Sequence, residues 1–368
     1  MATIGDRALH RLRELSPPPK HRDVAESIGM TADAFSRALS GKRQFSSIEL
    51  ARLADQIDAD LHWLITGQLD PRRVGVAARH DFNHDTGQRT IPGRASDEQT
   101  LTDIALAYRQ AYSEPRQVAD WPKSPASVRE MLGRGFVRPF ADRLEKVLGV
   151  DVVRVAELST AYSLTVGGRA VIAVPATGSW FRENWDIAHE LGHLVMGHHD
   201  DGLSLSDADQ HEAAANAFAA ELLLPAAELN KVAWDLIGDD DLAAFVWDWG
   251  VSTDALRRRL CALFGYAPNS VARWAAYPTQ RLLRLHLRIE SELDEITGRM
   301  DAASQRRFPL SIQEAHLGLI ASGAVSRATL AWMLGIDADS LDVDAPEIPE
   351  VDVDDLATAL GLGLPWPR

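Results

Sequence analysis

His189 and His193 stand four positions apart in the run His189-Glu190-Leu191-Gly192-His193. In an α-helix, residues at this spacing lie about 40° apart around the axis and one turn along it, so both imidazoles point to the same side. That geometry suits two ligands of one metal ion, and the pattern favours zinc. Glu190 then points toward the open side of the ion, where its carboxylate can take a proton from a bound water.

The surrounding sequence predicts a largely apolar helix from about Asn184 to Met196. Its apolar positions are Trp185, Ile187, Ala188, Leu191, Leu194 and Val195. The polar side chains of the motif are therefore expected to be buried, which costs free energy unless they have partners. A metal ion provides that partner.

Glu212 offers a third ligand, 19 positions after His193. It opens a second strongly helical run that ends at Pro225, and proline is a common end of a helix. Asn216 falls one turn later on the same face, from where it can hold a zinc-bound imidazole by its second ring nitrogen. Two His and one Glu leave a fourth position for water, which indicates a catalytic zinc site.

Two stretches, Ala188–His198 and Glu212–Pro225, resemble the ImmA/IrrE metallopeptidases, zinc proteases of the Glu-zincin type that cleave helix-turn-helix repressors. The resemblance covers roughly residues 96–275. It implies that His189, His193 and Glu212 bind zinc. It also implies that Glu190 is the general base. The second stretch ends in Leu224-Pro225 where the family often has Met-Pro, which is a conservative difference.

The bulk composition is that of a folded protein of several domains. A chain of 368 residues exceeds what one hydrophobic core usually organises, so two or three domains are expected. The N-terminus begins no apolar signal segment, and no later stretch reaches the length of a membrane span. The single cysteine, Cys261, excludes an intramolecular disulfide and fits a reducing cytoplasm. We therefore expect a cytoplasmic protein without membrane contact.

The net charge of −15 argues against a chain that coats nucleic acid indiscriminately. The charge is uneven, because residues 1–75 hold 11 Lys and Arg against 10 Asp and Glu, a balance of +1, and the remainder carries −16. Any contact with DNA is therefore expected in the N-terminal part of the chain.

The N-terminal part shows short helical segments with tight joints. Thr31 is placed as the N-cap of one helix, and Gly29 as the turn before it. Two short helices joined through a glycine turn form a helix-turn-helix unit. The five expected helices are Asp6–Leu15, Arg22–Ile28, Ala32–Leu39, one capped at Ser46-Ser47 that runs to Ile57, and Leu61–Ile65.

This module resembles the XRE-type, phage-repressor-like DNA-binding domains, and Phe35-Ser36-Arg37 and Gly41-Lys42-Arg43 carry the likeness. The resemblance implies that the helix beginning at Thr31 enters the major groove. The side chains expected at base edges are Ala32, Asp33, Ser36 and Arg37, and those expected at phosphates are Lys42 and Arg43. His21 replaces a common Gln, and Leu39 replaces a common Glu. The alternative is a repressor-like fold kept for protein contacts.

The sequence predicts a mainly α, α+β protein in four segments. These are a helix-turn-helix domain at 1–70, a linker at 71–95, a peptidase domain with a small antiparallel sheet at 96–275, and a helical C-terminal domain at 276–368. Residues 152–174 alternate around a Gly-Gly turn and predict a hairpin. Ala170–Val174 is our candidate for an exposed strand edge that holds substrate as an extra strand.

These features predict a zinc-dependent endopeptidase fused to a DNA-binding domain, a transcriptional regulator that cleaves a repressor or itself near the linker. The expected partners are DNA, a protein substrate and a second copy of the chain, since repressor-like modules usually bind paired half-sites as dimers. The rival hypothesis is a DNA-binding regulator whose peptidase-like domain is a sensor or dimerisation body without turnover. The candidates for stabilising an oxyanion are His198, His199, His211 and Tyr162.

Overall fold

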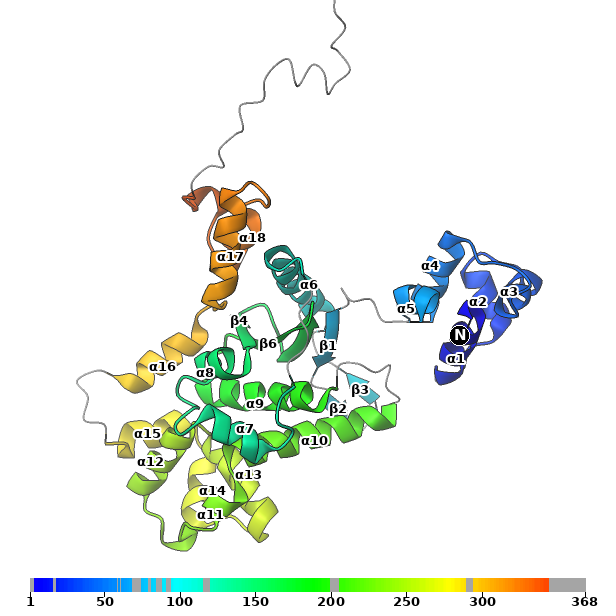
Figure 1. Ribbon diagram of the computed structural model, residues 1–368. Coiled ribbons are helices and arrows are strands. Elements are labelled where there is room, and N and C mark those ends of the chain that lie inside the picture. Colours follow the sequence, from blue (N-terminus) through cyan, green and yellow to red (C-terminus); the bar gives the residue numbers. More distant parts are fainter. Residues whose placement is uncertain are drawn as a thin grey trace, which may run out of the picture.

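The computed structural model confirms a mainly helical α+β protein (Figure 1). It describes residues 3–15, 18–57, 59, 61–67, 74–78, 81–83, 88–90, 94–114, 120–198, 205–288 and 294–343. The buried side chains of these residues gather in three hydrophobic cores. No helix in these ranges is both long enough and apolar enough to cross a membrane.

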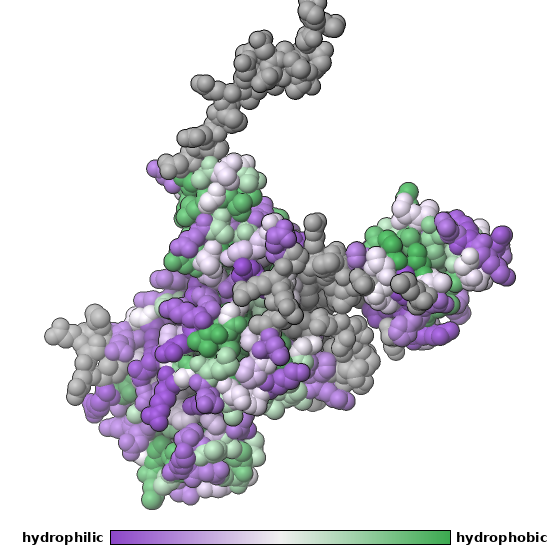
Figure 2. Space-filling model, in the orientation of Figure 1, coloured by the Kyte–Doolittle hydropathy of each residue, from purple (hydrophilic) through white to green (hydrophobic). Residues whose placement is uncertain are grey.

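The N-terminal helices form one unit around a core of their own. They are α1 (Ile4–Glu14), α2 (His21–Ser27), α3 (Ala32–Leu39), α4 (Ser47–Gln56) and α5 (Leu61–Thr66). All five expected helices are present, and Thr31 caps α3 by accepting a hydrogen bond from Ala34. Gly29, with φ +80°, makes the turn between α2 and α3. Figure 2 shows hydrophobic surface on this unit. Its exposed large apolar side chains are Ile48 of α4 and Leu61 and Ile65 of α5.

The central sheet has four strands in the order β1-β5-β6-β4. They are β1 (Val74–Ala78), β5 (Tyr162–Val166), β6 (Arg169–Pro175) and β4 (Val150–Val155). The predicted hairpin is present as β5–β6, but β4 pairs with β6 in parallel, so the sheet is mixed and not purely antiparallel.

Two predictions, one for a linker and one for a strand edge, are wrong. The segment 71–95 is not a plain linker, because β1 joins the central sheet, β2 (Asp81–Asn83) pairs with β3 (Gln88–Thr90), and a helix begins at Arg94. Ala170–Val174 is not an exposed edge either, because β6 lies between β5 and β4 and is almost entirely buried. Runs of β-branched residues mark a strand that is covered on both faces as readily as one at an edge.

Helices cover both faces of the sheet. Alternate side chains of a strand point to opposite faces, so Ile172 of β6 belongs to one core and Val171 to the other. The first core includes α7 (Pro125–Leu132), α8 (Phe140–Arg143), the π-helical turn Leu144–Leu148, α9 (Trp180–Met196) and α10 (Leu205–Leu223). The second core includes α6 (Arg94–Ala111), α17 (Leu310–Ala321) and α18 (Ala328–Leu334).

The remaining helices follow α10. They are α11 (Ala226–Leu229), the 3-10 turn Trp234–Leu236, α12 (Asp239–Trp249), α13 (Thr253–Phe264), α14 (Asn269–Ala275), α15 (Thr279–His286), α16 (Glu295–Ser304) and the 3-10 turn Ala338–Ser340. The described helices after residue 275 pack into the first and second cores, so residue 275 does not separate two cores.

Candidate metal centre

Helix α9 carries the two His, and its middle is enclosed on all sides. Its apolar residues pack against β6 and α10, and Gly197, with φ +71°, ends the helix in a left-handed C-cap. His189, Glu190 and His193 are all buried, as the apolar context of the motif predicts.

Helix α10 brings Glu212 to the same place. Nε2 of His189 lies 3.1 Å from Nε2 of His193, and each of these nitrogens lies 3.4 Å from an oxygen of Glu212. Three potential ligands from two separate segments therefore converge within 4.8 Å of one another. Among the residues that the structure describes, this is the group of His, Cys, Asp and Glu side chains that can hold a metal ion.

The spacing of these atoms fits zinc. With ligand bonds of about 2.0–2.1 Å, neighbouring ligands of tetrahedral zinc lie about 3.3 Å apart. The three measured separations of 3.1, 3.4 and 3.4 Å are close to that value. Two imidazole nitrogens and one carboxylate also form a donor set that zinc commonly takes in catalytic sites, with one position left for water.

The second ring nitrogens of both His have partners. Nδ1 of His189 lies 3.1 Å from Oδ1 of Asn216, which accepts the Nδ1 proton and leaves the Nε2 lone pair facing the other ligands. Nδ1 of His193 lies 3.0 Å from Nδ1 of His198. His198 is in turn stacked on His211, with ring centroids 3.7 Å apart. Both candidate ligands are therefore oriented before any metal binds.

Glu190 lies enclosed beside the two His, with none of its surface exposed. The hydroxyl of Ser163 in β5 donates a 2.7 Å hydrogen bond to Oε2, while Oε1 has no hydrogen-bond partner among the described residues. The sheet therefore fixes one carboxylate oxygen and leaves the other free to accept a proton.

The two carboxylates have opposite pKa shifts. Burial raises the pKa of Glu190, against the positive charges of His189 and His193. Burial also acts to raise the pKa of Glu212, but the hydrogen bonds and charges of the same two His outweigh it and hold that pKa well below its usual range. Burial and the nearby His193 and His211 lower the pKa of His198 to about 4.

A glycine allows the two helices to come close. A Cβ added to Gly192 would lie only 3.2 Å from the Cα of Ala215 and 3.2 Å from the Cβ of Phe218, both in α10. Such contacts are tighter than side chains normally accept. The absence of a side chain at Gly192 therefore lets α10 approach α9 closely enough for Glu212 to reach the imidazole pair.

The oxyanion candidates have different surroundings. Tyr162 is wrong for this role, because it is buried and its hydroxyl donates to the carboxylate of Asp97. His198 and His211 stack beside the metal ligands, where His198 holds His193. His199 lies outside the described residues.

In the N-terminal unit, most of the side chains predicted to face DNA are exposed. Those that are exposed are Thr31, Ala32, Asp33, Ser36, Arg37 and Lys42. Arg43 is different, because it donates two hydrogen bonds, of 3.0 and 2.8 Å, to the carboxylate of Glu49. The same carboxylate closes the capping box of α4 with Ser46, so Arg43 already has an acidic partner.

Both motifs of the candidate metal centre lie within one segment that matches a known protein family. Residues 145–261 match the family model of the IrrE N-terminal-like domain. This segment is therefore similar to peptidases of the ImmA/IrrE type. The match leaves residues 1–144 and 262–368 uncovered. Searches of curated proteins and of solved structures found no match to the chain.

Ser163 and His198 are the residues at this site whose contacts the sequence did not predict. A serine in a buried strand has no pattern of its own, since its partner Glu190 stands 27 positions away. His198 had a weak signal, because it lies five positions after His193 at the end of the same helix.

Proposed function

We propose that this chain is a zinc-dependent endopeptidase fused to a helix-turn-helix DNA-binding unit, and that it regulates transcription by cleaving a repressor or itself. The observation that carries the proposal is the convergence of His189, His193 and Glu212 at the spacing of tetrahedral zinc, beside the enclosed carboxylate of Glu190. The match of residues 145–261 to a peptidase family supports it.

The residues of the site have distinct roles in this proposal. His189, His193 and Glu212 hold the metal, and Asn216 and His198 orient the two imidazoles. When bound, zinc supplies a Lewis acid that makes water a nucleophile near neutral pH and polarises the peptide carbonyl. Glu190 takes the proton of the attacking water on its unpartnered oxygen and later gives it to the leaving amine.

The strand next to Glu190 suggests how a substrate is presented. Ser163, which binds Glu190, lies in β5, and its backbone neighbour across the ladder is Ala77 of β1. Peptidase substrates often bind as an extra strand on a sheet edge. On β5 that edge is already paired with residues 74–78 of the same chain. A foreign substrate that pairs with β5 must therefore displace β1, or the segment around β1 is itself the substrate.

Two variants test the peptidase proposal. Glu190→Gln should retain zinc and lose cleavage, because the amide cannot accept the proton, while His193→Ala should lose both. Zinc content is measured by elemental analysis. Cleavage is followed by mass spectrometry of the purified chain and of an added helix-turn-helix protein. Undiminished cleavage by Glu190→Gln would contradict the assigned role.

The second candidate is a DNA-binding regulator whose peptidase-like module senses or dimerises without turnover. Two observations favour it: Glu190 has no exposed surface, and β1 occupies the edge of β5. It predicts bound zinc, salt-sensitive binding to genomic fragments as a dimer, and no proteolytic fragment at any time. A fragment ending between residues 71 and 96 would exclude it and would indicate self-cleavage.

A further inference from the structure

A pocket lies on the side of α9 that faces α8 and the segment after α16. Its volume is about 370 Å³. Five arginines line it, which are Arg138, Arg154, Arg299, Arg306 and Arg307. The acidic side chains in its lining are Asp142 and Glu183. This excess of positive charge stands out in a chain whose net charge is −15.

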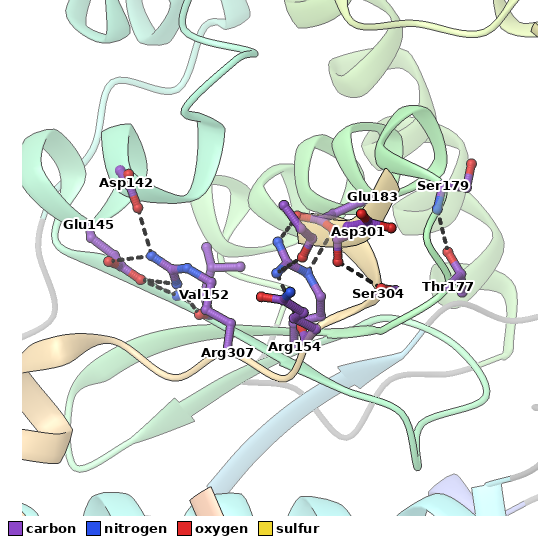
Figure 3. Close-up of polar contacts among 12 residues, drawn as sticks. Asp142, Glu145, Val152, Arg154, Thr177, Ser179, Glu183, Asp301, Ser304 and Arg307 are labelled. Carbon is purple, nitrogen blue, oxygen red and sulfur yellow. Dashed lines mark hydrogen bonds and ion pairs between the residues drawn. The ribbon is translucent and has the colours of Figure 1, made fainter. Parts of the chain in front are cut away.

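Four of the five arginines have acidic partners. Arg138 pairs with Asp248 and Arg306 with Glu157, and Figure 3 shows the contacts of Arg154 and Arg307. Arg154 donates to Glu183 at 2.8 Å and to the carbonyl of Ala302 at 2.8 Å. Arg307 donates to Asp142 and to Glu145, both at 2.9 Å. The contacts of Arg154 join β4 to α9 and α16, and those of Arg307 join the segment after α16 to the helices before β4. They leave little capacity in either guanidinium for a ligand.

Arg299 has no such partner. It is partly buried, yet no hydrogen bond or ion pair joins its guanidinium to the residues that the structure describes. The guanidinium carbon lies 3.9 Å from the ring centroid of Trp247, which fixes the side chain by a cation–π contact. Burial lowers the pKa of Arg299 to about 10, so it is still charged at neutral pH.

An arginine in this state is costly for the protein. Its burial is partial, but its five N–H donors have no acceptor among the described residues, so only water or a ligand can satisfy them. Arg138 adds a second positive charge nearby, over the same Trp247 ring, and Arg306 has a buried Nη1 without a partner. Arg138 is paired with Asp248 at the exposed rim, while Arg299 lies deeper. An anion in the pocket would satisfy these donors.

We propose that this pocket binds a small ligand through a phosphate group, with Arg299 as its principal contact and Arg138 and Arg306 beside it. A guanidinium presents parallel N–H donors that match phosphate oxygens, and neighbouring guanidiniums match a dianion. The volume lies at the low end of the range of about 300–1,000 Å³ for small-molecule sites. The ligand is therefore a small metabolite and not a polymer.

The pocket is built partly from the helix that carries the metal motif. Glu183 and Asn184 line it, and His189 follows in α9. The ligand thus contacts the same helix as the metal without sharing its residues. The proposal does not depend on peptidase activity, and its test uses binding alone.

The test is calorimetric titration of the full-length chain with pyrophosphate and with inorganic phosphate at constant ionic strength. Arg299→Gln should weaken binding roughly tenfold or more, because hydrogen bonds to charged groups are lost. Arg299→Lys should also weaken it, because an ammonium lacks the planar fork. The control is Arg288→Gln, which removes an 82% exposed arginine outside the pocket and should leave binding unchanged.

Several results would overturn the proposal: no saturable binding of either anion, equal binding by wild type and Arg299→Gln, or equal loss in Arg288→Gln. Repeating the titration with EDTA separates this site from the metal centre, because binding at the arginines must survive chelation. If circular dichroism shows that Arg299→Gln does not fold, Arg138→Gln at the rim replaces it and should weaken binding severalfold. Unchanged binding by a folded Arg138→Gln would then count against the site.

Discussion

Removing the side chain of Asn216 is expected to weaken zinc binding without unfolding the protein. Its Oδ1 lies 3.1 Å from Nδ1 of His189, and this contact selects the tautomer whose Nε2 lone pair faces the metal position. Loss of such a contact typically lowers metal affinity roughly 10–100-fold, or about 1.4–2.7 kcal/mol. Asn216 is only partly buried, so Asn216→Ala should change the thermal stability of the metal-free chain little.

The measurement is competition for zinc with a chromogenic chelator at fixed pH, since zinc binding requires neutral imidazoles. Asn216→Asp is the matched control, because its carboxylate still accepts the Nδ1 proton and should keep affinity within a few-fold of wild type. Equal affinity of Asn216→Ala and wild type would refute the reasoning. Equal loss in Asn216→Asp would show that the effect is steric and not due to the hydrogen bond.

Three further results are expected. The Arg43 hydrogen bonds lower the pKa of Glu49 to about 2 from 4.5, so Glu49 stabilises the fold above pH 4.5 and loses this effect as the pH falls toward 2. Glu49→Gln keeps the capping box but removes the charge that pairs with Arg43. It should therefore reduce thermal stability at pH 7 by up to about 1 kcal/mol, and not at pH 2, as circular dichroism melts can check. Lys42→Ala should reduce the slope of log affinity for DNA against log salt by about 0.9, measured by fluorescence anisotropy; an equal effect of Lys231→Ala would remove Lys42 from the DNA surface. Prolines at both Gly75 and Val76 remove one N–H that faces β5, since adjacent N–H groups point to opposite edges. They should raise cleavage of an added unstructured peptide above that of the double alanine variant, and no rise would argue that β1 does not cover the substrate edge.

Local features of the fold could be predicted from the sequence. Thr31 and Ser46 mark helix starts, because their hydroxyls accept backbone N–H groups that have no partner inside the helix. Gly29, with φ +80°, makes the predicted turn between α2 and α3. The spacing of His189 and His193 likewise depends on one helical turn.

Non-local pairing could not be predicted in the same way. Nothing in Val74–Ala78 indicates that it pairs with residues 162–166, because a five-residue strand gains its stability from its partner. The same limit explains the error at β6. Its apolar run shows that the strand is buried, but only the parallel pairing with β4 shows that it is not an edge.

The candidate metal centre lies between these two cases. Its two His are a local feature, whereas the position of Glu212 depends on how α10 crosses α9. Gly192, inside the motif, decides that crossing, since a Cβ there would meet the backbone of Ala215 at 3.2 Å. In a motif read for its ligands alone, this glycine is only a spacer. In the folded chain it lets the third candidate ligand, the carboxylate of Glu212, reach the imidazoles. The motif therefore specifies the packing of its own site as well as two of the ligands.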